Sequence, residues 1–248
     1  MDLNKIENIL INNNCDFIHF KSTTSTMDEA KLHLEKFQSN VVVIADEQTR
    51  GRGRRGNKWI STPGNIYCSI AINNSIPIKD YFLFSILSAV SIKYTIENFG
   101  VKEIKFKWPN DILFENKKFA GLILESYNSV KNNKYVIIGI GINFFSSPTI
   151  EHYKTTHIKK FLTIKNKFIF LNYFFTNFFF YWHNYIKQKK IIFSIFENSL
   201  LFLNKKIEIN IGDNQSIQGI FKGIRNDGSL ILYKDDKLLS VYSGNIII

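Results

Sequence analysis

Residues 40–56 read NVVVIADEQTRGRGRRG, an apolar run that leads into the most basic stretch of the chain. The run at 40–46 predicts a buried strand. Residues 50–56 then hold four arginines and three glycines, and Arg225 is the only arginine elsewhere. Glycines leave a backbone loose and like charges repel, so such a loop at the end of a core strand indicates an anionic partner. Nucleic acid and a small polyanion such as ATP both fit it.

Length and composition are typical of a globular protein. The 248 residues allow one large domain or a larger and a smaller one, and 45% of them are apolar. The two cysteines, Cys15 and Cys68, are too few for a disulfide framework or a metal site, which predicts a reduced, cytoplasmic protein. The N-terminus lacks the pattern of a signal peptide. The net charge of +11 gives weak support for a polyanion partner, because the lysines are spread along the whole chain.

The aromatic stretch FIFLNYFFTNFFFYWHNYI at 168–186 is long enough to be mistaken for a membrane span. At 100° per residue its polar members share less than half of the helix circumference. The stretch therefore predicts an amphipathic helix with an aromatic buried face, and no membrane partner is expected. These polar members are Asn172, Thr176, Asn177, His183 and Asn184.

Periodicity and turn residues predict a mixture of strands and helices over residues 1–202. Ser25 or Thr26, followed by Asp28 or Glu29, is typical of a helix start with a capping box. The mixture predicts an α+β sheet domain. The expected helices besides 168–186 are 25–37 and 80–99, and the expected strands are 41–45, 66–72, 104–109, 119–126 and 135–144.

The character of the chain changes at residues 203–248. Short alternating segments are separated by turns such as Asn226-Asp227-Gly228, a strong hairpin signal. These segments predict a small all-β barrel that is too small to be stable without docking on its neighbour. The expected strands are 206–211, 216–224, 229–233 and 238–242.

The loop GRGRRG (51–56) matches neither of two common phosphate-binding patterns. No GK[ST] follows it, and arginines stand between its glycines, whereas a dinucleotide loop relies on backbone amides. Arginine forks pair with phosphate or carboxylate oxygens through two parallel hydrogen bonds. Trp59, three residues on, offers a flat face to a base. A solvated basic loop remains the plain alternative.

A second polar cluster lies in KFKWPNDILFENKKFAGLILES, residues 105–126. Pro109 removes a donor and forbids helix at the residue before it, so the strand must end there. Asp111 is a carboxylate within a cationic set, which suits a magnesium ligand, although a turn-forming aspartate fits as well. Gly121 allows close backbone approach. Lys118 alone would be read as a solvated lysine.

Together these stretches resemble the biotin protein ligases. The likeness covers about residues 18–145 in detail, and the β-rich tail matches the family's small C-terminal domain. It implies a mixed sheet with flanking helices, akin to the catalytic domains of class II aminoacyl-tRNA synthetases, plus an SH3-like barrel at 203–248. The motifs that carry it are GRGRRG with Trp59, KWPND (107–111) with KFAG (118–121), STM (25–27) and IGIGIN (138–143).

The resemblance implies a two-step reaction. The carboxylate of biotin attacks the α-phosphate of ATP, with Mg²⁺, to give biotinyl-5′-AMP and pyrophosphate. A lysine of a biotin carboxyl carrier protein, as in acetyl-CoA carboxylase, then takes up the biotin and AMP leaves. Homodimers that pair through the sheet are common in the family. Only about twenty residues precede the motifs, so a form without the N-terminal DNA-binding domain, with no specific DNA partner and no repressor function, is expected.

The resemblance also assigns roles to individual residues. The catalytic residues are Lys118, Arg52 and Arg54. The biotin-binding residues are Ser25, Thr26, Met27, Gln48, Arg52, Gly53, Arg54, Lys118 and Gly121. The ATP-binding residues are Arg52, Arg54, Arg55, Trp59, Lys107, Asn110 and Asn143, and Asp111 is the magnesium ligand. The loop 51–56 would be mobile until an anion neutralises it, and would then act as a lid.

One position departs from the family pattern, and two other functions compete. Met27 stands where the family usually has asparagine, so either the helix start shifts or biotin binding loses one hydrogen bond, about 1 kcal/mol. A lipoate or octanoate transferase would share the sheet but lack the GRGRRG and KWPND pair. A nucleic-acid-binding module would spread base-stacking aromatics along a groove, whereas this chain concentrates its polar groups around one small site.

Overall fold

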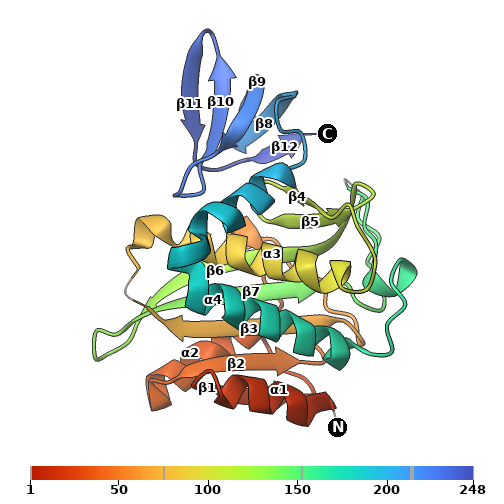
Figure 1. The fold of residues 1–248 in the computed structure, drawn as a ribbon, viewed down its shortest axis with the longest axis vertical. Helices are drawn as coiled ribbons and strands as arrows, with labels where there is room; N and C mark the ends of the chain where they lie inside the picture. Colours follow the sequence, from red (N-terminus) through yellow and green to blue (C-terminus); the bar gives the residue numbers. More distant parts are fainter. Residues whose placement is uncertain (1, 75, 152, 213–214, 248) are drawn as a thin grey trace.

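A computed structural model describes residues 2–74, 76–151, 153–212 and 215–247. Its larger part is a seven-stranded mixed sheet with the strand order β1-β2-β3-β7-β6-β5-β4, in which only β1 and β2 run parallel (Figure 1). The expected mixed sheet with flanking helices is therefore confirmed. The strands are β1 (Cys15–Phe20), β2 (Asn40–Ala45), β3 (Ile66–Asn73), β4 (Lys105–Lys107), β5 (Asp111–Phe114), β6 (Lys117–Asn128) and β7 (Lys134–Ile142).

The helices form a layer on each face of this sheet. Alternate residues of a strand point to opposite faces, so Val42 faces α3 and α4 while Val41 faces α2. Helix α1 packs on α4 and β1 at the sheet edge (Figure 1). The α-helices are α1 (Asp2–Ile11), α2 (Thr26–Phe37), α3 (Phe82–Glu97) and α4 (Lys167–Asn198), and the short 3₁₀ helices are η1 (Arg54–Gly56), η2 (Ile78–Asp80) and η3 (Ile158–Lys160).

Helix α4 has the aromatic buried face that its sequence predicts. Phe170, Phe174 and Phe178 are fully or almost fully buried, whereas Thr176 on the other side is exposed. It is longer than expected, because the amphipathic pattern continues to Asn198. None of the helices in the described ranges has the length and apolar character needed to cross a membrane.

The start of α2 differs from the expected capping box. Ser25 is the N-cap, but its side chain makes no capping hydrogen bond. Glu29 instead accepts a hydrogen bond from the hydroxyl of Thr23, which belongs to the preceding turn. The polar side chains at this helix start are therefore tied to neighbouring segments rather than to the helix backbone.

The C-terminal residues form a separate five-stranded antiparallel sheet with the order β11-β10-β9-β8-β12. Within the described residues, β11 and β12 are the two edge strands of this sheet, and no hydrogen bonds join them. The strands that were expected to form a closed barrel therefore form an open sheet. Its strands are β8 (Lys206–Gly212), β9 (Gln215–Ile224), β10 (Leu230–Lys234), β11 (Lys237–Val241) and β12 (Asn245–Ile247).

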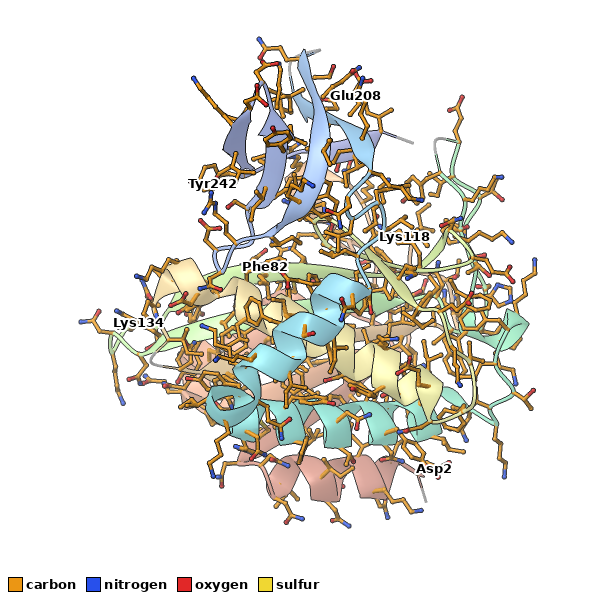
Figure 2. The ribbon with its side chains drawn as sticks, turned by 45° about the horizontal axis from the view of Figure 1, so that its top comes forward. Asp2, Phe82, Lys118, Lys134, Glu208 and Tyr242 are labelled. Carbon is orange, nitrogen blue, oxygen red and sulfur yellow. The ribbon has the colours of Figure 1, made fainter. Side chains whose placement is uncertain are left out.

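The two sheets share one hydrophobic core. The buried cluster beneath α3 and α4 continues through Phe106 and Trp108 into the C-terminal sheet. The indole nitrogen of Trp108 donates to the carbonyl oxygen of Gly228 at 2.8 Å. Phe82, at the start of α3, lies beneath that sheet, and a Cβ on Gly228 would come within 2.5 Å of its ring (Figure 2). The KWPND segment is thus a docking point as well as part of the site.

We expect Trp108→Phe to lower the free energy of unfolding by about 1 kcal/mol, because the indole hydrogen bond to the carbonyl of Gly228 is lost. Denaturant titration measures this loss. Trp182→Phe is the matched control, because Trp182 packs against Phe84 and makes no hydrogen bond within the described residues. Equal effects of the two changes would show that the hydrogen bond contributes nothing.

Candidate active site

The candidate site lies where the start of α2, the loop after β2, the turn between β4 and β5, the first half of β6 and the end of β7 meet. Figure 2 places Lys118 on the side of the large sheet that faces the C-terminal sheet. Most of the residues expected from the sequence converge here, although they come from separate segments of the chain.

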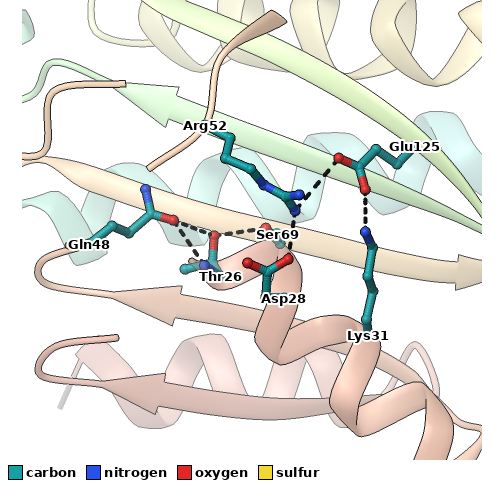
Figure 3. A network of polar contacts seen from close by, with 7 residues as sticks. All are labelled: Thr26, Asp28, Lys31, Gln48, Arg52, Ser69 and Glu125. Atoms are coloured by element: carbon teal, nitrogen blue, oxygen red, sulfur yellow. Dashed lines mark hydrogen bonds and ion pairs between the residues drawn. The ribbon is translucent and has the colours of Figure 1, made fainter. Parts of the chain in front are cut away.

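Neutral hydrogen-bonding groups gather at the start of α2 (Figure 3). The Gln48 side-chain oxygen accepts from the Thr26 backbone N–H at 2.9 Å and from the Thr26 hydroxyl at 3.1 Å. That hydroxyl also lies 2.8 Å from the hydroxyl of Ser69 on β3, a residue that sequence reasoning missed. Thr26 and Ser69 are buried, so these groups form a fixed polar corner.

The floor of the site is made by two glycines on neighbouring strands. Gly121 on β6 pairs in register with Gly141 on β7, and the indole of Trp59 lies directly on them. A Cβ on Gly141 would be 2.4 Å from Trp59 Cε2, and one on Gly121 would be 2.9 Å from Cζ3. Only glycine permits this approach. Trp59 Nε1 is buried with no hydrogen-bond partner among the described residues, which costs roughly 1–3 kcal/mol.

Lys118 is held at the centre of the site by three neighbours. Its ammonium nitrogen lies 2.7 Å from Asp111 Oδ1. The same nitrogen stands 5.3 Å from the ring centroids of both Trp59 and Tyr153, within the range of a cation–π contact. Tyr153 was not expected at the site, because it lies in the connection between β7 and α4, where no motif marks it. The reading of Lys118 as a merely solvated lysine is wrong, because its side chain is largely buried.

Two further cations crowd the same space. Burial lowers the pKa of Lys107, with Asp111 opposing that shift and Lys118 adding to it. Burial also lowers the pKa of Arg54, and the neighbouring Arg55 lowers it further. Clustered, partly dehydrated cations with one carboxylate among them are poised to bind an anion.

The arginine loop has hydrogen-bonding partners in the protein on both sides. Arg52 pairs with Asp28 of α2 at 2.7 Å, and Arg55, whose φ is +54°, donates to the hydroxyl of Ser243 in the C-terminal sheet domain. The Gly53 N–H bonds to the Asn57 carbonyl at 2.7 Å. The mobility of this loop without ligand stays a prediction.

Three of the expected ligand-binding side chains have other partners. Asn110 donates to the carbonyl of Leu122 at 2.7 Å, and Asn143 donates to the carbonyl of Thr156 at 3.2 Å. Met27 is buried in the core between α2 and the sheet, and its sulfur fills the space above Gly139. These side chains shape the walls of the site by holding its backbone.

The residues present offer limited support for a magnesium ion. No group of three or more His, Cys, Asp or Glu side chains that could hold a metal occurs within the described ranges. Asp111 is a single carboxylate, already paired with Lys118. Magnesium in phosphate-transfer sites is commonly bound by one or two carboxylates together with substrate phosphates, and Asp111 fits only that kind of site.

A mixed sheet with flanking helices thus carries neutral hydrogen-bonding groups at Thr26 and Gln48 and a cluster of cations around Lys118. The model of the Biotin/lipoate A/B protein ligase family matches residues 17–143, and that of the Biotin protein ligase C terminal domain matches residues 202–248. The chain therefore belongs to the biotin/lipoate A/B protein ligase family.

Curated relatives are similar over parts of their length. A bifunctional ligase/repressor BirA of Bacillus subtilis is 38% identical over 108 residues, 43% of this chain and 33% of that protein. The Escherichia coli BirA is 25% identical over 229 residues, 85% of this chain and 67% of that protein. A biotin--[acetyl-CoA-carboxylase] ligase of Paracoccus denitrificans is 32% identical over 131 residues, 51% of this chain and 53% of that protein. The match thus spans about a third of the Bacillus protein.

Solved structures share the fold. The biotin protein ligase of Aquifex aeolicus in complex with biotin and ATP has a TM-score of 0.74 at 22% identity, covering 93% of this chain and 97% of that one. The Leishmania major biotin protein ligase in complex with biotinyl-5-AMP has a TM-score of 0.64 at 21% identity, covering 93% and 99%.

We expect Gly141→Ala to force the Trp59 indole off the floor, because the new Cβ would sit 2.4 Å from its ring. The emission of Trp59, isolated by subtracting the spectrum of Trp59→Phe, should then shift to the red as the indole meets water. Gly139→Ala is the control, since its Cβ would press on Ile123 and Met27 instead of Trp59. Unchanged emission in Gly141→Ala would contradict the described floor.

Proposed function

We propose that the chain is a biotin protein ligase that forms biotinyl-5′-AMP from biotin and ATP and then transfers biotin to a lysine of a biotin carboxyl carrier protein, as in acetyl-CoA carboxylase. The observation that carries this proposal is the placement of the Lys118–Asp111 pair on the Gly121–Gly141 floor, beside the Thr26–Gln48 corner. The uncharged ureido ring of biotin would meet the neutral groups of Thr26 and Gln48, and its anionic carboxylate would meet the Lys118 ammonium.

In the first step the residues bind and neutralise rather than react covalently. Thr26 and Gln48 offer neutral hydrogen bonds to the ureido ring of biotin. Lys118 and Arg54 would stabilise the negative charge that builds up as the biotin carboxylate attacks the α-phosphate and pyrophosphate departs. Holding both anions in contact removes much of the entropic barrier to their reaction.

In the second step the amine of the carrier lysine attacks the carbonyl carbon of the mixed anhydride. The new C–N bond forms, the C–O bond to phosphate breaks, and AMP leaves with its charge held by Lys118 and the loop arginines. The loop 51–56 would exclude water until the carrier arrives, because the anhydride hydrolyses when it is solvated.

The remaining assignments support the same reaction. Trp59 and Lys107 are proposed to contact the nucleotide, and Asp111 is the residue proposed to ligate the Mg²⁺ that neutralises the ATP phosphates. We place the boundary between a catalytic domain and a C-terminal domain at 202/203, in accord with the two sheets and the two family matches. The cytoplasmic location, the homodimer and the lack of repressor function stay sequence-based predictions.

Purified protein should exchange labelled pyrophosphate into ATP only when biotin is present, with lipoate inert. Lys118→Gln should lower the exchange rate about 10²-fold, because one preorganised charge at the reacting phosphate is lost. Lys117→Gln removes the same charge from the exposed neighbour and should leave the rate unchanged. Equal exchange with lipoate would place the chain in the other branch of the family.

Arg54→Gly should release the activated intermediate. The guanidinium is proposed to close over the adenylate, so its loss should speed dissociation of biotinyl-AMP and label lysines of a bystander protein. Stability should change little, since a half-exposed loop side chain contributes little to it. Bystander labelling equal to wild type, with a normal first step, would show that the loop is not a lid.

A further inference from the structure

Arg52 is held by a network of charges that joins α2 to β6 (Figure 3). Its Nη2 lies 2.7 Å from Asp28 Oδ1 and 3.6 Å from Glu125 Oε1. The other oxygen of Glu125 lies 2.6 Å from Lys31 Nζ. Two cations thus face two carboxylates at the edge of the site, and neither carboxylate was expected from the sequence.

Both carboxylates meet the same nitrogen of the guanidinium. Planar guanidinium binds a carboxylate or phosphate through two parallel bonds, from Nε with Nη2 or from Nη1 with Nη2. Each of these two faces uses one hydrogen of Nη2, and Nη2 already donates one of its two hydrogens to Asp28. Within the described residues Nε and Nη1 of Arg52 have no partner. An anion that binds the face whose Nη2 hydrogen is bonded to Asp28 must therefore replace that carboxylate, and an anion on the other face still approaches Nη2 with Glu125 Oε1 only 3.6 Å from that nitrogen.

We propose that Asp28 and Glu125 are positioning and selectivity residues that hold Arg52 beside the site and compete with anionic ligands for it. They act as an internal anion that a ligand must displace. The identity of that ligand, biotin carboxylate or adenylate phosphate, rests on the proposed function. The competition itself depends only on the contacts around Arg52.

An anion can displace the two carboxylates from Arg52 at little cost, because each carboxylate still has another partner or water afterwards. Glu125 keeps Lys31 at 2.6 Å when Arg52 turns away. The Asp28 side chain is 45% exposed, so water replaces the arginine. Exposed pairs of this kind are weak, and a ligand that brings two or more charges outcompetes them. A singly charged ion such as chloride gains less electrostatic free energy on binding Arg52. Competition from the two carboxylates therefore favours polyanions.

Inorganic pyrophosphate is the probe, titrated calorimetrically into the full chain at low ionic strength without biotin. Asp28→Asn and Glu125→Gln should each bind it about two- to fivefold more tightly than wild type, the range expected for losing an exposed ion pair. The gain should shrink at high salt. Glu35→Gln is the matched control: it removes a charge from α2 about 10 Å along the helix, where the one partner of the Glu35 carboxylate among the described residues is the Tyr127 hydroxyl.

A double-mutant cycle assigns the gain to Arg52. In an Arg52→Gln background, Asp28→Asn should no longer tighten pyrophosphate binding, because the guanidinium for which Asp28 and pyrophosphate compete is absent. Weaker or unchanged binding in Asp28→Asn would overturn the proposal, and so would a gain that persists without Arg52 or that Glu35→Gln reproduces. Pyrophosphate binding requires no reaction with biotin, so this outcome is independent of whether biotin-dependent exchange is found.

Discussion

The absence of side chains at Gly121 and Gly141 is the constraint on which the site depends. These two residues face each other on β6 and β7, and the Trp59 indole rests on them at distances that a single methyl group would abolish. The indole in turn provides one of the faces beside which the Lys118 ammonium lies. A flat glycine floor therefore places an aromatic ring and a cation at the middle of a sheet that is otherwise densely filled with branched side chains.

The cations gathered around this floor are balanced by internal carboxylates. Asp111 pairs with Lys118, and Asp28 and Glu125 pair with Arg52. Such pairing allows these cations to cluster in a half-buried site when no ligand is bound, because burying an unpaired charge would cost folding free energy. It also means that binding of an anion is an exchange of partners. The basic character seen in the sequence is thus strong locally but largely compensated.

The sequence predicts what depends on local pattern and misses what depends on distant contacts. The strands β2, β3, β6 and β7 and the helices α3 and α4 follow from apolar periodicity, and the GRGRRG and KWPND motifs located the site. The short or less apolar elements α1, β1, β5 and β12 lacked a clear pattern and gain stability from packing. Asp28, Ser69 and Tyr153 enter the site only through the fold. The side chains of Asn110 and Asn143 donate to backbone carbonyls of the protein, and their contact with ATP stays a prediction.

The central claim is that Lys118, on the glycine floor, is the residue that meets the negative charge of the ligand. A crystal structure of the chain with biotinyl-5′-adenylate measures this directly. The account predicts that a phosphate or carbonyl oxygen of the ligand lies within about 3 Å of Lys118 Nζ, with the ligand close to Gly121 and Gly141. A ligand bound elsewhere, with Lys118 still paired only to Asp111, would contradict it.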